Sequence, residues 1–189
     1  MLTSRRAFLQ SVALSACALP SWLPPHVDLL PIERVFFDAR QTPALAFAES
    51  ARELGARTHA VRGDVDDPCY RELSRRWQSK RAPIAGMTDF RTLFLLQTMA
   101  EDAGLRPVLR IHHRVWNGSA AHDTFGAHRY RVLAVKCLAV RGESWNREIA
   151  RLVMNLPECD AMTMHRSGNL CEANLRALAS KSLVTWVIA

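Results

Sequence analysis

The sequence predicts an α/β fold: a largely parallel or mixed sheet of about five strands with helices on both faces. Short apolar runs typical of strands alternate with segments whose apolar residues recur every three or four positions, as they do in helices. Such alternation favours parallel strands joined by right-handed helical crossovers. The last run, Leu183 to Ile188, is apolar almost throughout and indicates a strand buried on both faces, inside the sheet.

The first half of the chain predicts two strands and three helices. The strands are expected at 34–38 and 58–61. The first helix starts near Pro43 and ends at Gly55, the second opens at Pro68, and the third runs from Asp89 to Ala103 with Thr88 as its cap. The segment 83–87 contains proline and glycine, and we expect a loop there.

The second half predicts three more strands and two helices. Residues 106–115 alternate in character and should form a strand, and residues 116–128 a glycine-bearing loop. A strand at 130–140 would then pair antiparallel with the strand at 106–115. Helices are expected at 145–156 and 170–179, ahead of the terminal strand.

Composition and missing motifs exclude several classes of function. The 25 basic residues outnumber 18 acidic ones, but the arginines are scattered, so no nucleic-acid partner is indicated. No glycine-rich phosphate loop, no G-x-S-x-G nucleophile turn and no haem or iron–sulfur cysteine spacing occurs. Length suits a single α/β domain, expected at 33–189.

The amino terminus carries the most specific motif of the chain. Ser4-Arg5-Arg6-Ala7-Phe8-Leu9 and the mildly apolar run after it resemble the twin-arginine signal peptide over residues 1–23. The resemblance implies export of the folded chain to the periplasm. It implies the export machinery as a partner and makes a co-exported protein a candidate second partner. Residues 1–18 would be the signal peptide and 19–32 a proline-rich linker. The apolar run is too short for a membrane span, which needs about 20 residues.

Two overlapping patterns leave the processing of this signal open. Cleavage after Ala18 would give a soluble periplasmic protein. Leu14-Ser15-Ala16-Cys17 resembles a lipobox, in which Cys17 would be lipidated and the protein anchored to a membrane facing the periplasm. A membrane partner is expected only in this second case.

Four further cysteines raise the prospect of disulfides in an oxidising compartment. Cys159 and Cys171 are the preferred pair, because a short stretch with turn-forming residues separates them. Cys69 and Cys137 would then pair by default. The alternative is four buried free thiols, since a protein of this route folds in the reducing cytoplasm.

One candidate site follows from the expected topology. Ligands of open α/β sheets bind beyond the carboxyl ends of strands, and those ends here carry Asp38 and Arg40, then Arg62 and Asp64. The two carboxylates could act in catalysis or hold a cation, and the two arginines could bind an anionic substrate. The alternative is that both aspartates cap the following helices and pair with neighbouring arginines.

Histidines form a second, weaker cluster. His112, His113, His122 and His128 fall within 17 residues, close to Asp123. His112 and His113 would point to opposite faces of a strand, so only one could join a given site, as a proton carrier. Their spacing does not place two imidazoles on one face, which favours ordinary packed or exposed histidines over a metal site.

These observations leave three functional hypotheses. The first is an exported accessory or assembly protein of the periplasm. The second is a small metal-assisted hydrolase with Asp38, Asp64 and His112 as catalytic residues and Arg40 and Arg62 as substrate ligands. The third is a subunit of a redox complex. The sequence specifies no cofactor.

Overall fold

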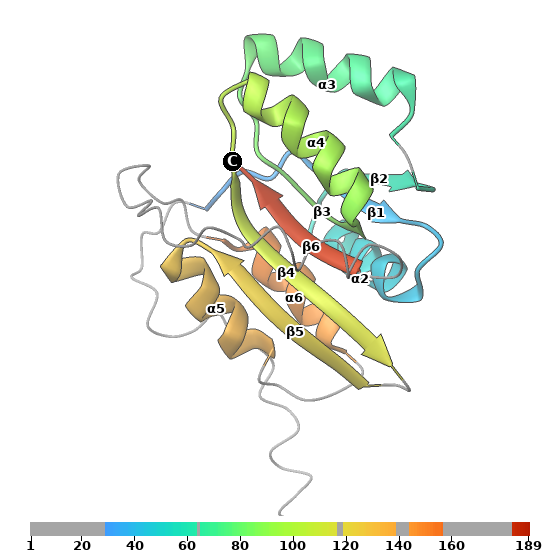
Figure 1. The fold of residues 1–189 in the computed structure, drawn as a ribbon, viewed down its shortest axis with the longest axis vertical. Coiled ribbons are helices and arrows are strands. Elements are labelled where there is room, and N and C mark those ends of the chain that lie inside the picture. The colour runs from blue at the N-terminus through green and yellow to red at the C-terminus, as the bar shows by residue number, and fades with distance from the viewer. Residues whose placement is uncertain (1–28, 64, 117–118, 139–143, 157–182) are drawn as a thin grey trace, which may run out of the picture.

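The computed structural model describes residues 29–63, 65–116, 119–138, 144–156 and 183–189 of the chain. Six strands form one sheet in the order β2-β1-β3-β6-β4-β5 (Figure 1). Their bounds are β1 Arg34–Asp38, β2 Thr58–Val61, β3 Ile84–Asp89, β4 Pro107–Trp116, β5 Ser119–Gly126 and β6 Leu183–Ile188.

The sheet is mixed. β1 is parallel to both β2 and β3, whereas β6 is antiparallel to β3 and β4, and β5 is antiparallel to β4. The predicted fold class, a mixed sheet with helices on both faces, is confirmed.

Five described helices cover the two faces of the sheet. They are α2 Thr42–Glu53, α3 Asp67–Ser79, α4 Phe90–Asp102, α5 His128–Leu138 and α6 Trp145–Met154. Alternation along β1 sends Val35 and Phe37 into the core beneath α2, α5 and α6, and Phe36 into the core beneath α3 and α4. Figure 1 shows α3 and α4 side by side near the β2 edge. None of the described helices is long and apolar enough to cross a membrane.

β6 lies inside the sheet, as predicted, and all six of its side chains are buried. The Trp186 Nε1 group donates a hydrogen bond of 2.9 Å to Thr88 Oγ1 on β3. Opposite Trp186 stands Gly86, where an added Cβ would come within 2.5 Å of the indole ring. The close approach of β3 and β6 therefore requires glycine at this position.

The expected loop at 83–87 is wrong, because most of it belongs to β3. Pro83 lies just ahead of the strand, where its missing amide costs no ladder hydrogen bond. Ile84, Ala85 and Met87 are buried, and Gly86 accommodates Trp186. Packing against β6, which is distant in sequence, outweighs the local proline and glycine signals.

The expected strand at 130–140 is also wrong, since α5 covers residues 128–138. Its buried residues Tyr130, Leu133 and Ala134 follow helical spacing. The antiparallel partners of β4 are β6 and β5, and β5 lies within the segment expected to be a loop.

The expected cap of α4 differs from the structure by one residue. The cap of α4 is Asp89, whose side chain accepts a hydrogen bond from Thr92 N, so Thr88 is not the cap. The helix expected at 170–179, the signal segment 1–23 and the cysteines at 17, 159 and 171 lie outside the described residues.

Candidate functional site

The carboxyl ends of β1 and β3 form the edge at which topology places a ligand site. α2 connects β1 to β2 on one face of the sheet, and α3 connects β2 to β3 on the other face. The connections therefore leave in opposite directions on either side of the gap between β1 and β3, which makes this gap a topological switch point. Ligands of open α/β sheets bind in the crevice outside such a point. Asp38 ends β1 and Asp89 ends β3, so both carboxylates lie at this edge.

Arg40 occupies the space between these two acids. Asp38 Oδ1 accepts hydrogen bonds from Arg40 N at 3.0 Å and Arg40 Nε at 2.9 Å, and Asp38 Oδ2 accepts one from the guanidinium at 2.8 Å. The guanidinium also donates to Asp89 Oδ2 at 3.1 Å. Burial tends to raise the pKa of Asp38, but the hydrogen bonds and charge of Arg40 together hold it below its usual value.

Both oxygens of Asp38 are therefore engaged within the protein. The carboxylate is 1 % exposed, and a cation could bind it only by displacing Arg40. The alternative interpretation of Asp38 was that it pairs with a neighbouring arginine and caps the following helix. The pairing with Arg40 is present, but the cap position of α2 is Gln41 and not Asp38. Arg62 is exposed, and Asp64 lies outside the described residues.

The histidines of β4 point to opposite faces, as expected. His113 is buried, with Nδ1 at 2.8 Å from His122 Nδ1 and Nε2 at 2.7 Å from Thr185 Oγ1, beside the ring of Trp145. Burial, followed by the charges of His122 and His112, lowers the pKa of His113 well below its usual value, so the ring is neutral. His113 and His122 are packed, hydrogen-bonded residues; His128 begins α5.

His112 does not join the strand-end residues. It lies on β4, separated from Asp38 on β1 by β3 and β6. Three strand spacings amount to about 14 Å, too far for a shared proton. Its ring is buried against Phe125, and burial lowers the pKa of His112. The structure thus contradicts the expected grouping of His112 with Asp38.

A cluster that the sequence analysis did not single out lies between β2 and α3. One donor atom each of His59, Asp66 and Cys69 lies within 4.8 Å of the others. His59 pairs in register with Phe36 and packs beside its ring, which places it on the α3 side of the sheet. Asp66 is the N-cap of α3, and its Oδ1 accepts a hydrogen bond of 2.9 Å from Cys69 N.

Arg34 and Glu72 flank this cluster as an ion pair. The Arg34 guanidinium donates to Glu72 Oε2 at 3.1 Å and contacts Cys69 Sγ at 3.9 Å. Burial raises the pKa of the Cys69 thiol; the acids Asp66 and Glu72 raise it further, and Arg34 opposes them. Without a competing metal, Cys69 is therefore protonated at neutral pH.

The cysteine placement also corrects the sequence analysis. Cys69 and Cys137 are both free thiols, Cys69 in the core under α3 and α4, Cys137 against the core under α2, α5 and α6. The sheet separates them, so the default pairing is wrong. Asp66 and Cys69 are three residues apart, at the N-cap and in the first turn of α3. This spacing is the sequence signal that could have indicated the cluster, but Cys69 was expected in a disulfide instead.

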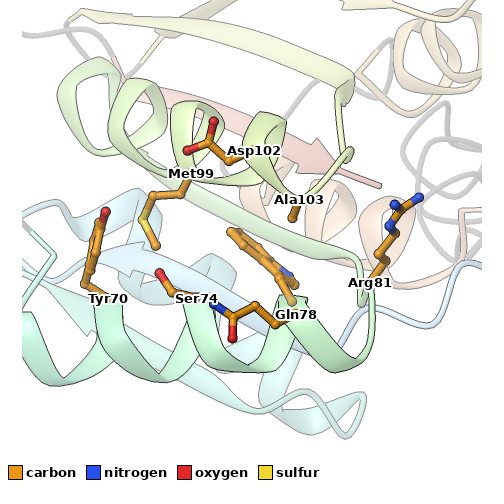
Figure 2. Close-up of a pocket in the computed structure, with 8 residues that line it drawn as sticks. Tyr70, Ser74, Gln78, Arg81, Met99, Asp102 and Ala103 are labelled. Carbon is orange, nitrogen blue, oxygen red and sulfur yellow. The ribbon is translucent and has the colours of Figure 1, made fainter.

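A separate cavity of about 430 Å³ opens between α3 and α4. In Figure 2, Met99 extends from α4 toward Tyr70 and Ser74 on α3, whereas the Asp102 carboxylate points away from α3. Its charged residues, Arg81 and Asp102, do not converge, and no pair of acid and base groups faces one point. Polar and apolar side chains both line this cavity, and its described charged groups do not form a catalytic or metal-binding pair.

Comparison with protein-family models, curated proteins and solved structures finds no match.

Proposed function

We propose that this protein is an exported accessory protein that binds a divalent transition-metal ion of the zinc class. The observation that carries the proposal is the convergence of His59, Asp66 and Cys69, with donor atoms within 4.8 Å of one another. The role is to hold or deliver the ion in the periplasm.

The donor set selects the class of metal. One imidazole nitrogen, one carboxylate oxygen and one thiolate sulfur suit zinc, which binds all three ligand types. Magnesium and calcium prefer oxygen ligands alone, so nitrogen and sulfur argue against them. Among the described residues no second cysteine joins the cluster, as a copper(I) site would favour.

The distances fit with a small adjustment. Tetrahedral zinc with bonds of about 2.0 to 2.3 Å places its ligand atoms roughly 3.3 to 3.8 Å apart. The cluster must therefore contract by up to about 1.5 Å, which rotation of exposed Asp66 and half-buried His59 can supply. Buried Cys69 is the fixed point of the set.

Charge also favours a divalent ion. The Cys69 thiolate and the Asp66 carboxylate together balance two positive charges, while Arg34 and Glu72 neutralise each other. Because the ion must displace the thiol proton, metal binding should release a proton and strengthen as pH rises.

The proposed route of export agrees with this role. The segment resembling a twin-arginine signal implies that the chain folds before export. Cys69 would then meet its metal in the reducing cytoplasm, where it stays a thiol.

The three ligands found among the described residues fill three of the four positions of tetrahedral zinc, as in catalytic zinc sites, where the fourth holds water or substrate. This supports a metal-assisted hydrolase as the second candidate function. We favour the accessory role because Glu72, the described carboxylate that flanks the cluster, is bound by Arg34 and not free to act as a base.

Titration of the purified metal-free protein with Zn²⁺ and Co²⁺ tests the proposal. We expect one equivalent of either ion to bind, with a Co²⁺–thiolate absorption band. Single variants His59→Gln, Asp66→Asn and Cys69→Ser should each weaken binding about tenfold or more, the scale of losing one zinc interaction. Asn keeps the helix cap, so Asp66→Asn separates ligation from stability.

Cys137→Ser and His128→Gln are matched controls, since they remove a free thiol and an exposed imidazole elsewhere. Both should bind as the wild type does. Equal Zn²⁺ affinity in wild type and all three cluster variants, or no binding by the wild type, would refute the metal site.

A further inference from the structure

A second pocket, of about 350 Å³, lies at the amino-terminal edge of the parallel strands, opposite the Asp38 edge. Its charged lining consists of Glu33, Arg57, Arg76, Lys80 and Arg81. Glu33 and Arg57 precede β1 and β2, whereas Arg76, Lys80 and Arg81 come from the end of α3 and the residues after it. Elements distant in sequence thus bring four cations to one cavity.

Three of these cations have no acidic partner within the described part of the chain. Arg76 forms an ion pair with Glu33 and lies 3.8 Å from Glu72. Arg57, Lys80 and Arg81 are exposed, and no described carboxylate pairs with them. Arg81 also lines the cavity between α3 and α4, and its guanidinium lies beside Gly104, just after α4. Like charges held in one cavity repel each other, so this arrangement is unfavourable without a compensating anion.

The helix ends nearby do not provide enough compensation. α2 and α3 both end at this pocket, where Gly55 and Lys80 line it. A third helix, α4, ends beside the Arg81 guanidinium. Each carboxyl-terminal helix end carries about half of a negative charge, so the three ends together offset roughly one and a half of the three positive charges. Between about one and two positive charges therefore remain unbalanced among the described residues.

The backbone around the pocket is held in place by hydrogen bonds. Glu33 N donates to Pro83 O at 2.8 Å, and Val35 N donates to Arg57 O at 2.8 Å. Trp77 Nε1 donates to Ala82 O at 3.0 Å, which fixes the segment after α3. A cavity whose walls are fixed before binding loses little conformational freedom when a ligand enters.

We propose that this pocket binds a small anion carrying two or more phosphate or carboxylate groups. The Arg57 guanidinium and the Lys80 ammonium match the oxygens of such an anion, arginine with paired hydrogen bonds, and Arg81 adds positive charge beside them. The cavity volume lies within the range of small-molecule sites. The site is independent of the proposed metal cluster.

Calorimetric titration with pyrophosphate and with citrate at low ionic strength tests this proposal. We expect one anion per chain, and the tighter of the two distinguishes a phosphate from a carboxylate ligand. The triple variant Arg57→Gln, Lys80→Gln, Arg81→Gln should weaken binding by about tenfold or more.

The matched control is the triple variant Arg71→Gln, Arg75→Gln, Arg91→Gln, which removes the same charge from exposed helical positions outside the pocket. It should bind nearly as well as the wild type. Equal losses in both variants, or no binding of either anion by the wild type, would overturn the proposal. If the triple pocket variant fails to fold, the single variants Arg57→Gln and Lys80→Gln are tested instead. Wild-type anion affinity in both single variants would also overturn the proposal.

Discussion

At the scale of single residues, Asp38 illustrates how a candidate catalytic group can be a structural one. Its carboxylate is 1 % exposed and receives three hydrogen bonds from Arg40. Sequence reasoning placed Asp38 and Arg40 together at a strand end, because a residue type and its position in the chain suffice for that. It could not supply the side-chain rotamer, which decides whether the oxygens face a ligand or Arg40.

This contact predicts the pH dependence of stability. Asp38→Asn should lower the free energy of unfolding at pH 7 by about 2 kcal/mol, the contribution of hydrogen bonds to a charged group. The pKa of Asp38 is lowered in the folded state, so its contribution is present above the unfolded value of about 3.9 and is lost as pH falls through the folded value. Urea unfolding of both proteins at pH 7 and pH 3 measures the difference.

The difference between wild type and Asp38→Asn should therefore shrink at pH 3. Asp123→Asn is the control, because its ion pair with Arg114 is half-exposed on both sides and contributes little. A difference for Asp38→Asn that stays constant from pH 7 to pH 3 would contradict the assignment.

At the scale of elements, the sequence predicts well the segments whose signals are local. The strands at 34–38, 58–61 and 183–188 and the helices α2, α3 and α6 follow from apolar periodicity with proline and glycine boundaries. β3 and β5 could not be predicted in this way, because the contacts that stabilise them come from β6 and β4. α5 was mistaken for a strand since its buried face is narrow.

The β3–β6 contact gives an element-scale prediction. Gly86→Ala should destabilise the fold by about 1 to 3 kcal/mol, as overpacking in a core does. The added methyl would come within 2.5 Å of the Trp186 ring and 2.8 Å of Phe36 O. Thermal or urea unfolding measures this cost.

Two comparisons isolate the cause. Gly55→Ala adds a methyl that meets nothing within 4 Å, so it reports only the strain of its positive φ. In a Trp186→Phe background the smaller ring should accommodate part of the new methyl, and Gly86→Ala should cost less there. An identical cost in both backgrounds would rule out the indole contact as its origin.

At the scale of the whole molecule, the topology predicts where a site lies more accurately than it predicts which residues form the site. The strand order around β1 places a switch point at the Asp38 edge. The β2–α3 connection from the same edge carries Asp66, and the first turn of α3 carries Cys69. Neither the proposed metal cluster nor the basic pocket has a recognisable sequence motif. Each is assembled from separate elements, so only the folded arrangement brings their residues together.

Export supplies the whole-molecule prediction, because it concerns where the folded chain works. Arg5→Lys with Arg6→Lys should leave the protein in the cytoplasm, since the paired arginines are the residues on which the resemblance to a twin-arginine signal depends. Both precede the domain expected at 33–189, so the purified variant should match the wild type in thermal stability and in Zn²⁺ binding. Immunodetection in fractionated cells, with marker proteins for each compartment, measures the change. Normal periplasmic accumulation of the variant would argue against this route, whereas cytoplasmic retention of a stable, metal-binding variant would separate routing from folding.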